Sequence, residues 1–507
     1  MSVYLREVKT ENGWVQGIPA ADPRITAFKG VPFAKPPVGE LRWRAPQSAE
    51  DWDGIRPCKE FAPISMQTPP GLDPDNIYTK EWHVDPEIPM SEDCLYLNIW
   101  TPSKTGDENF PVFVWYFGGG LKEGNTAEME FDGERIARRG IVVVTINYRV
   151  NIFGFLCHPE ITKESPEAPA NFGHLDQQFG TRWVKRNISA FGGDPENITI
   201  GGQSAGGMSV SAQICCPENK GLFQKAIIMS GIVGDNYTDF PRFSYSLEEA
   251  EEEGVKFFDF LGVKTLAEAR ALDAIYIRDK TTEYNRMFGS IVDGRFQHGP
   301  AAHKLRRGER LDVPVMVGWT NNEFSAGPSG EDAESIIAEL REAFSKEEAE
   351  KIIELINPEK DPAAARKALT YITTEIGCRT FLRGEELQGK ITSPRYAYEF
   401  GPTIPGDDSG AFHSSDLWFF FETLAKCWRP FVGYHYDLSR KMCNYWCNFF
   451  RTGDPNGNDT EGTPLPRWEP YTEELPAVMN FHDEIKLNTQ PVDFYTDICI
   501  DGILKQE

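Results

Sequence analysis

The chain has 507 residues, of which 40% are hydrophobic and 25% charged, a balance typical of a globular protein with a large buried core. Its formal net charge of −25 argues against nucleic acid as a partner. No stretch approaches the roughly 18 consecutive apolar residues of a membrane span, and the first residues lack the pattern of a signal peptide. We therefore expect a cytoplasmic protein, with secretion as the alternative if a leader has been removed.

Apolar runs rich in β-branched residues alternate with helical stretches along the chain. The expected strands cover residues 112–117, 141–146, 198–200, 226–229, 313–317 and 395–400. Between Thr199 and Ser230 the order is strand, helix, strand, as a parallel βαβ unit requires. Most runs are too continuously apolar to face water, so we predict an α/β fold whose large, mostly parallel sheet carries helices on both faces.

Neither repeats nor low-complexity tracts divide the chain, and we expect a single domain over residues 1–507. Long insertions near residues 65–90 and 235–288 interrupt the alternating pattern, and a helical segment covers residues 331–390. The strands should form the floor of any site, so these segments are expected to form its rim or cap.

Two glycine-rich stretches carry the chemical signal. The expected strand at 112–117 runs directly into Gly118, Gly119 and Gly120, where backbone N–H groups can approach a substrate carbonyl as an oxyanion hole requires. Ser204 lies between Gly202 and Gly206 where a strand gives way to a helix, as in a nucleophile elbow. A glycine-rich turn without chemistry is the alternative for each, because glycine is common.

A serine nucleophile on such an elbow is followed in the chain by an acid and then a histidine. Glu323 comes just after an expected strand, where the acid belongs. Of the later histidines, His413 lies in a Gly/Pro-rich loop after the strand at 395–400. His435 lies in an aromatic helical stretch and His482 in a charged turn. We therefore predict a triad of Ser204, Glu323 and His413.

Several longer segments are similar to those of a known family. "FKGVPFAKPPVGELRWRAPQ", "SEDCLYLNIWTP", "FGGDPENITIGGQSAGG" and "RTGDPNG" resemble, in their usual order, signature segments of the type B carboxylesterases. This family is the cholinesterase-like branch of the α/β-hydrolase fold, and the resemblance covers nearly the whole chain. It implies a serine carboxylic-ester hydrolase that acts on a small-molecule ester through the same triad and an acyl-enzyme, without metal or cofactor.

The resemblance also assigns supporting residues. The family's oxyanion donors correspond to the backbone N–H groups of Gly119, Gly120 and Ala205. Its buried ion pairs, which we assign to stability, correspond to Arg42–Glu92 and Arg149–Asp176. Ser230 matches a serine behind the acid and histidine, with a plain strand-end turn as the alternative.

Two departures from the family pattern stand out. Phe117 precedes the glycine run, where many family esterases have histidine. Extracellular members often bridge the position of Cys94 to a cysteine in the loop at residues 65–90, but Ser65 and Met66 stand near that place here. We therefore expect Cys94 to be a free thiol, which favours a reducing compartment.

Two other functions are weighed against a general esterase. A neuroligin-like adhesion domain would lose the serine, which this chain keeps. A cholinesterase-like enzyme would present an indole to a cationic substrate near Trp82, although an exposed tryptophan on the rim is the alternative. We expect an apolar pocket for short- to medium-chain esters, with candidate lining residues Trp82, Phe117, Leu121, Phe324, Phe412 and Trp418.

Overall fold

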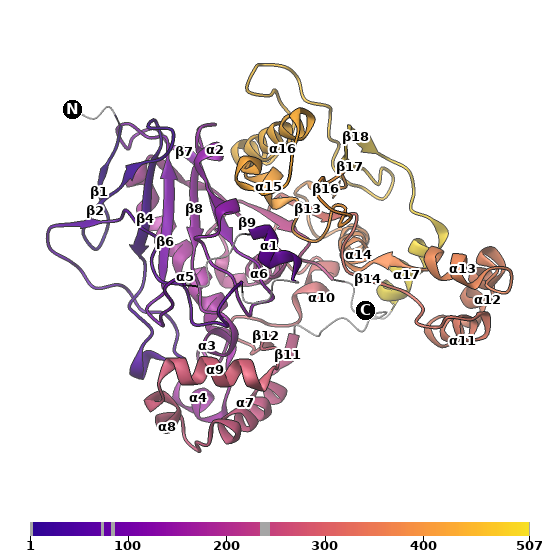
Figure 1. The fold of residues 1–507 in the computed structure, drawn as a ribbon, viewed down its shortest axis with the longest axis horizontal. Helices are drawn as coiled ribbons and strands as arrows, with labels where there is room; N and C mark the ends of the chain where they lie inside the picture. Colours follow the sequence, from indigo (N-terminus) through magenta and orange to yellow (C-terminus); the bar gives the residue numbers. More distant parts are fainter. Residues whose placement is uncertain (1–3, 72–75, 83–86, 234–243, 506–507) are drawn as a thin grey trace.

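The computed structural model describes residues 4–71, 76–82, 87–233 and 244–505. Its largest element is an 11-stranded sheet with the order β18-β17-β16-β13-β10-β9-β7-β8-β6-β4-β3 (Figure 1). The strands are β3 (Ile18–Pro19), β4 (Thr26–Pro32), β6 (Tyr96–Thr101), β7 (Phe110–Tyr116), β8 (Val142–Ile146), β9 (Gly193–Gln203), β10 (Lys225–Met229), β13 (Val315–Thr320), β16 (Arg395–Phe400), β17 (Val478–Phe481) and β18 (Ile485–Asn488). Strands β17 to β8 in this order are parallel, and antiparallel strands extend both edges. The prediction of a mostly parallel central sheet is confirmed.

Each face of the sheet carries its own hydrophobic core. Along β7, Val112, Val114 and Tyr116 enter one core, while Phe113 and Trp115 enter the other. Helices α5 (Phe172–Asn187), α6 (Ala205–Ile214) and α14 (Thr373–Gln388) contribute to the first core, and α15 (Leu417–Phe420) and α16 (Gly433–Thr452) to the second. Helices on both faces explain why the strands are apolar throughout.

The strand order changes direction at β7. The chain passes from β7 to β8 on one side and then to β9 on the other, and such a reversal opens a ligand site in open α/β sheets. The loops that leave the two strands touch, because a Cβ added to Gly118 would lie 3.2 Å from the Cβ of Ser204. The topology thus brings both glycine-rich stretches together.

The insertions occupy two regions. Residues 65–90 include α1 (Ile77–Trp82), and the part of residues 235–288 that the structure describes forms β11 (Ser244–Ser246), α7 (Leu247–Leu261), α8 (Leu266–Ala271) and α9 (Ala274–Tyr284). The last three helices lie beside α3 (Asn151–Phe155) and α4 (Pro159–Glu164) at one end of the molecule (Figure 1). Residues 234–243 lie outside the described part of the chain.

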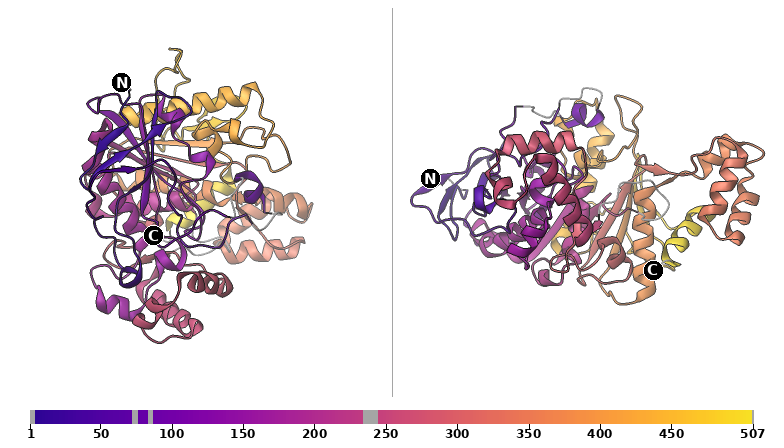
Figure 2. Two further views of the ribbon diagram at one scale, coloured as in Figure 1. Left: turned by 60° about the vertical axis from the view of Figure 1, so that its left-hand side comes forward. Right: turned by 90° about the horizontal axis from the view of Figure 1, so that it is seen from below.

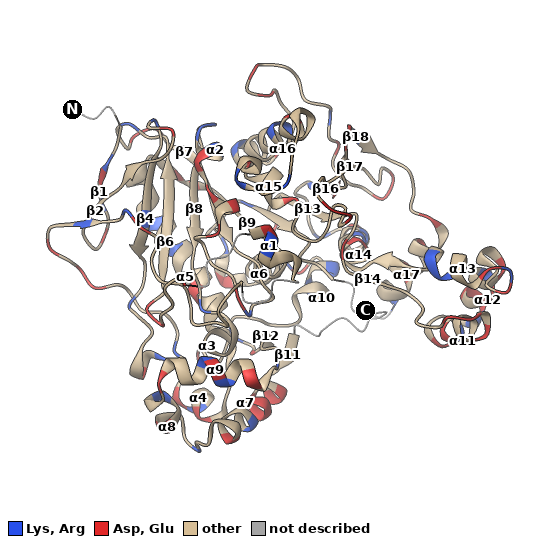
Figure 3. Ribbon diagram, viewed as in Figure 1, with Lys and Arg blue, Asp and Glu red and all other residues tan. Residues whose placement is uncertain are grey.

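The helical segment near residues 331–390 divides into two parts. Helices α11 (Ala333–Ala343), α12 (Lys346–Ile356) and α13 (Pro362–Ala368) project from the body of the molecule (Figure 2). The chain leaves and returns through the paired strands β14 (Ser325–Ala326) and β15 (Tyr371–Ile372), and α14 then packs on the sheet. Acidic residues gather on α7 and on the projecting helices α11, α12 and α13 (Figure 3). Much of the negative charge therefore lies on helices outside the central sheet and its covering layers.

The other strands and α-helices of the described residues lie outside the central sheet and the helices named above. They are β1 (Glu7–Lys9), β2 (Trp14–Gln16), β5 (Ile55–Pro57), β12 (Ser290–Val292), α2 (Glu134–Ala137), α10 (Ala301–Arg306) and α17 (Phe494–Lys505). None of the helices formed by the described residues has both the length and the apolar character needed to cross a membrane.

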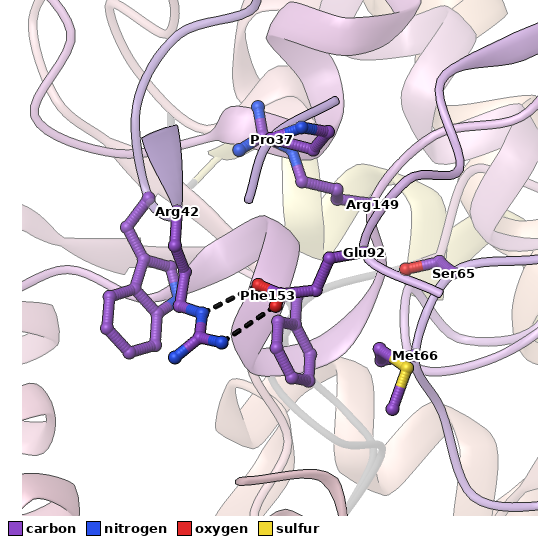
Figure 4. A pocket seen from close by; sticks show the side chains of 8 residues that line it. Pro37, Arg42, Ser65, Met66, Glu92, Arg149 and Phe153 are labelled. Atoms are coloured by element: carbon purple, nitrogen blue, oxygen red, sulfur yellow. Dashed lines mark hydrogen bonds and ion pairs between the residues drawn. The ribbon is translucent and has the colours of Figure 1, made fainter. Parts of the chain in front are cut away.

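Two buried ion pairs secure the base of the loop at residues 65–90. Arg42 makes a bidentate pair with Glu92 at 2.6 and 2.7 Å, and Arg149 pairs with Asp176 at 2.8 Å. A small pocket beside them is lined by Pro37, Arg42, Trp43, Ser65, Met66, Glu92, Arg149 and Phe153 (Figure 4). Arg42 also donates to the carbonyl of Leu272 at 2.8 Å. Arg42 therefore links the insertion near residues 235–288 to Glu92, which lies just after the loop at residues 65–90.

Ser65 lies close to the buried Cys94 thiol, and all ten cysteines are free in the structure. We predict that Ser65→Cys forms a bridge to Cys94 on mild oxidation. Closing a loop of about 30 residues should raise the free energy of unfolding by up to about 3 kcal/mol. Thiol titration of denatured, unreduced protein should find every thiol free in the wild type and two lost in the oxidised variant. Met66→Cys serves as the control and should form no bridge to Cys94.

Candidate active site

Ser204 lies at a strained turn between β9 and α6. Its backbone has φ 57° and ψ −125°, a conformation that residues other than glycine rarely adopt. The turn is tight, because a Cβ at Gly206 would lie 2.1 Å from the carbonyl oxygen of Tyr116. A Cβ at Gly202 would lie 2.4 Å from the carbonyl carbon of Gly206. Glycines are therefore required around the serine, whose side chain is left partly exposed.

The loop after β7 carries consecutive residues with positive φ. Gly119, Gly120 and Leu121 have φ values of 103°, 65° and 58°. Gln67 from the insertion holds this loop through two hydrogen bonds with Gly124, of 2.9 and 3.0 Å. Ala205 begins α6, where the first N–H groups have no partner within the helix. Consecutive positive φ values next to a helix N-terminus are a backbone pattern suited to an oxyanion hole.

Glu323 follows β13 and is enclosed by hydrogen-bond donors. The N–H of Thr320 donates to its Oε1 at 2.8 Å, and the Ser230 hydroxyl makes a short hydrogen bond to the same oxygen. Its Oε2 lies 2.8 Å from Nδ1 of His413. Burial alone would raise the pKa of Glu323, but His413 and these hydrogen bonds hold it below its ordinary value. The carboxyl group is thus kept ionised beside the histidine.

His413 has a hydrogen-bond partner at each ring nitrogen. Besides the contact with Glu323, its Nε2 lies 3.3 Å from the side-chain nitrogen of Gln203. An amide NH₂ group only donates, so Nε2 accepts and the ring proton is on Nδ1. Among the described residues no hydrogen bond joins Ser204 to His413; such bonds are often long without substrate. His413 is therefore in the tautomer of a general base.

A buried network fixes the loop that carries His413. The fully buried side chain of Arg429 pairs with Glu81 of α1 at 2.8 Å and with Asp407 at 2.9 Å. It also donates to the carbonyl of Pro405 at 3.0 Å. The insertion at residues 65–90 thus helps to position the histidine as well as the glycine loop. By contrast, His435 bonds the carbonyl of Thr403 at 2.9 Å and lies within the core.

The predicted pocket residues have different environments. Phe117, Leu121 and Trp418 are at most 1% exposed, which corrects their assignment to a pocket wall: they are core residues. Phe117 instead stacks on Tyr148, with ring centroids 4.2 Å apart. Trp82 is not an exposed rim residue either, since it is only 9% exposed.

Trp82 packs against Trp418, with ring centroids 5.3 Å apart, because the short helix α1 turns its indole inward. Phe412 is 6% exposed and precedes His413 directly. Phe324 is 42% exposed, and its ring centroid lies 4.7 Å from that of His413. Phe324 is thus the candidate best placed to meet a substrate.

Sequence reasoning missed several residues around the site. Gln203 directly precedes Ser204, so its position in the chain was a usable signal. No sequence signal pointed to the other three residues, Gln67, Tyr398 and Asp416, because their contacts join different elements of the fold. Tyr398 donates its hydroxyl to Asp416 at 3.2 Å, and both side chains are buried.

The doubly covered parallel sheet and the elbow at its carboxyl edge define an α/β-hydrolase. The sequence profile described as the carboxylesterase family matches residues 5–495. The chain is 30% identical over 506 residues to the para-nitrobenzyl esterase of Bacillus subtilis (strain 168), covering 96% of each chain. It is 32% identical over 531 residues to human carboxylesterase 5A, covering 96% of this chain and 88% of that one.

Solved structures agree with these sequence relatives. A PNB esterase aligns with a TM-score of 0.76 and 28% identity, covering 97% of this chain and 99% of that one. A carboxylesterase of Geobacillus stearothermophilus aligns with a TM-score of 0.76 and 30% identity, covering 97% and 100%. The chain belongs to the carboxylesterase family, and it is a serine ester hydrolase.

The contact between Ser230 and Glu323 gives a prediction. Ser230→Ala removes one hydrogen bond to a buried carboxylate, so kcat should fall about tenfold and the free energy of unfolding at neutral pH by about 1–3 kcal/mol. The loss of stability should shrink as the pH falls through the folded-state pKa of Glu323, because the stability that comes from a lowered carboxyl pKa disappears there.

Ser415→Ala is the matched control, since the Ser415 hydroxyl is buried without a hydrogen-bond partner. Esterase kinetics and urea unfolding at several pH values measure both effects. Equal effects of the two substitutions would contradict a specific role for Ser230.

Proposed function

We propose that Ser204 is the nucleophile, His413 the general base and Glu323 the orienting acid of this carboxylesterase. The observation that carries the assignment is the 2.8 Å contact between His413 Nδ1 and Glu323 Oε2, with Nε2 left as the acceptor beside the elbow. His413 Nε2 takes the proton of Ser204 as its Oγ attacks the ester carbonyl. The ionised Glu323 stabilises the imidazolium that results.

The backbone supports the tetrahedral intermediate. We assign the N–H groups of Gly119, Gly120 and Ala205 as donors to its oxyanion. Rigid donors aimed at a developing charge need no reorganisation during the reaction, and one such donor contributes about 3 kcal/mol. Support comes from the positive φ values that fix the loop and from the position of Ala205 at the start of α6.

The second half of the reaction uses the same groups. His413 returns the proton to the departing alcohol, which leaves an acyl group on Ser204. Water then loses a proton to His413 and attacks the acyl carbonyl, and the acid departs as Ser204 recovers its proton. Gln203 has to give up its contact with Nε2 whenever Ser204 or water uses that nitrogen.

Neutral esters of short to medium acyl chains are the proposed substrates. Phe324 presents apolar surface beside His413, and the Bacillus subtilis relative described above is named a para-nitrobenzyl esterase. The near-complete burial of Trp82 against Trp418 disfavours the alternative of a cationic ester bound on an open indole. We also propose a reducing, cytoplasmic location, because Cys94 is a free thiol and Ser65 and Met66 stand where the family's secreted members have its partner cysteine.

The roles assigned to the three triad residues predict different losses of kcat when each residue is replaced. Ser204→Ala and His413→Ala should each lower kcat by about 10⁶, and Glu323→Gln by about 10⁴, because a base remains when its orienting charge is lost. A fluorophosphonate should label Ser204 in the wild type, with the adduct found by peptide mass spectrometry. His435→Ala is the control and should keep its activity if it folds. An Ser204→Ala enzyme with a tenth of wild-type turnover would falsify the nucleophile assignment.

Acyl-chain length tests the proposed pocket. Each buried CH₂ adds about 0.8 kcal/mol, close to fourfold in kcat/KM. Efficiency on aryl esters should therefore rise from acetyl to about butyryl or hexanoyl and then fall, and emulsified long-chain triglycerides should be poor substrates. Butyrylcholine should show no advantage over a neutral isostere. A strong choline preference that Trp82→Ala abolishes would favour the cholinesterase-like alternative.

A further inference from the structure

The loop that leaves β7 is folded back on itself. The carbonyl of Gly119 accepts hydrogen bonds from the N–H groups of Lys122 and Glu123, each at 3.0 Å. A Cβ at Gly124 would lie 2.5 Å from the carbonyl oxygen of Gly118, so the two ends of the loop are in contact. Residues 118–124 thus form one closed turn, which we call the glycine loop.

The closed turn fixes the direction of the peptide group between Gly119 and Gly120. In a trans peptide the C=O and the following N–H point in opposite directions. Because the carbonyl of Gly119 points into the glycine loop, the N–H of Gly120 points out of it. Within the part of the chain that the structure describes, this N–H has no hydrogen-bond acceptor, and a Cβ at Gly120 would meet no other part of the chain within 4 Å. The N–H of Gly120 is therefore open to a ligand.

The local sequence does little to hold this orientation. Gly119 and Gly120 have φ values of 103° and 65°. Glycine adopts positive and negative φ about equally readily, so a peptide group between two glycines can turn over at low cost. The orientation therefore depends on contacts with other parts of the molecule.

Gln67 supplies such contacts from the insertion near residues 65–90. It is only 1% exposed, and its Oε1 accepts the N–H of Gly124 at 2.9 Å. Its Nε2 donates to the carbonyl of Gly124 at 3.0 Å and to that of Ser65 at 3.1 Å. One side-chain amide thus pairs with both backbone groups of Gly124. That end of the glycine loop cannot move away without leaving buried polar groups unpaired, which is costly.

Asn151 joins the same two segments a second time. Its Nδ2 donates to the carbonyl of Met66 at 2.8 Å and to that of Lys122 at 3.3 Å. Its own N–H donates to the carbonyl of Leu121 at 2.6 Å. Residues 65–67 and the glycine loop are therefore held side by side, directly through Gln67 and indirectly through Asn151.

We propose that Gln67 is a positioning residue for catalysis, which keeps the glycine loop closed and the N–H of Gly120 aimed at the oxyanion. This inference rests on the oxyanion donors assigned under the proposed function. Without Gln67 the loop has to be ordered again as the negative charge develops, and that cost falls on the transition state and not on the bound ester. The insertion near residues 65–90 contributes to turnover in this way.

The first test is the kinetics of Gln67→Met with a neutral aryl ester. Methionine keeps the length of the side chain and removes all three hydrogen bonds. Loss of a complete oxyanion donor lowers kcat by about 10²–10³, so displacement of one donor should lower it by about 10–100-fold, with KM changed by less than about threefold.

A pair of aryl ketones separates positioning from a general loss of structure. Ser204 adds to the carbonyl carbon of a trifluoromethyl ketone, its proton passes to His413, and the carbonyl oxygen becomes an oxyanion. The methyl ketone with the same aryl group binds as the intact carbonyl. In Gln67→Met the inhibition constant of the trifluoromethyl ketone should rise about as much as kcat/KM falls, whereas that of the methyl ketone should change by less than about threefold.

Thr68→Val is the matched control from the same insertion. The Thr68 hydroxyl lies 2.8 Å from that of Thr282 on α9, so its loss should leave kcat and both inhibition constants unchanged. Gln67→Asn keeps the amide on a side chain one CH₂ shorter. It should give an intermediate loss of kcat, and it provides the test if Gln67→Met does not fold.

The outcomes separate this proposal from the proposed function on which it rests. Folded Gln67 variants with wild-type kcat, or with an equal loss of affinity for both ketones, overturn the role of Gln67 and leave the oxyanion donors in place. An equal loss of kcat in Thr68→Val also overturns it. Wild-type enzyme that binds the two ketones equally well contradicts the oxyanion donors themselves, and the role of Gln67 with them.

Discussion

The ionised carboxylate of Glu323, buried at the end of β13, is the constraint on which the site depends. Removing such a charge from water costs several kcal/mol unless hydrogen bonds and an opposite charge replace the solvent. Here the replacements come from Thr320 at the end of β13, from Ser230 just after β10, and from the loop that carries His413. The carboxyl ends of neighbouring parallel strands can converge in this way because the strands all point to one edge.

The same edge explains why the serine and the glycine loop lie together. The strand order reverses at β7, so the loop leaving it lies beside the turn leaving β9. Close packing then demands glycine at positions 202 and 206 and leaves Ser204 strained and only partly exposed. The strain persists because strands and helix on every side fix the turn.

The sequence predicted those parts of the structure that chain order and local pattern determine. Apolar runs located the central strands, and chain order selected Glu323 and His413, which the structure brings into contact; their roles with Ser204 stay a prediction. The side-chain environments of Phe117, Trp82 and Trp418 were not predictable, because whether an aromatic residue lines a cavity or fills a core depends on its partners. Phe117 is a core residue because it stacks on Tyr148. Trp82 is buried because α1 turns its side chain inward against Trp418.

Gln203 is an uncharged residue whose side-chain amide contacts Nε2 of His413. Its amide donates to His413 Nε2, so in the free enzyme it favours the tautomer that the proposed mechanism requires. Once His413 is protonated, Nε2 becomes a donor and the same amide nitrogen no longer suits it. In the proposed mechanism the contact therefore stabilises the ground state of the free enzyme and is released as proton transfer proceeds. Glu323, by contrast, gains attraction as the imidazolium forms, so the two contacts of one ring act at different stages of the reaction.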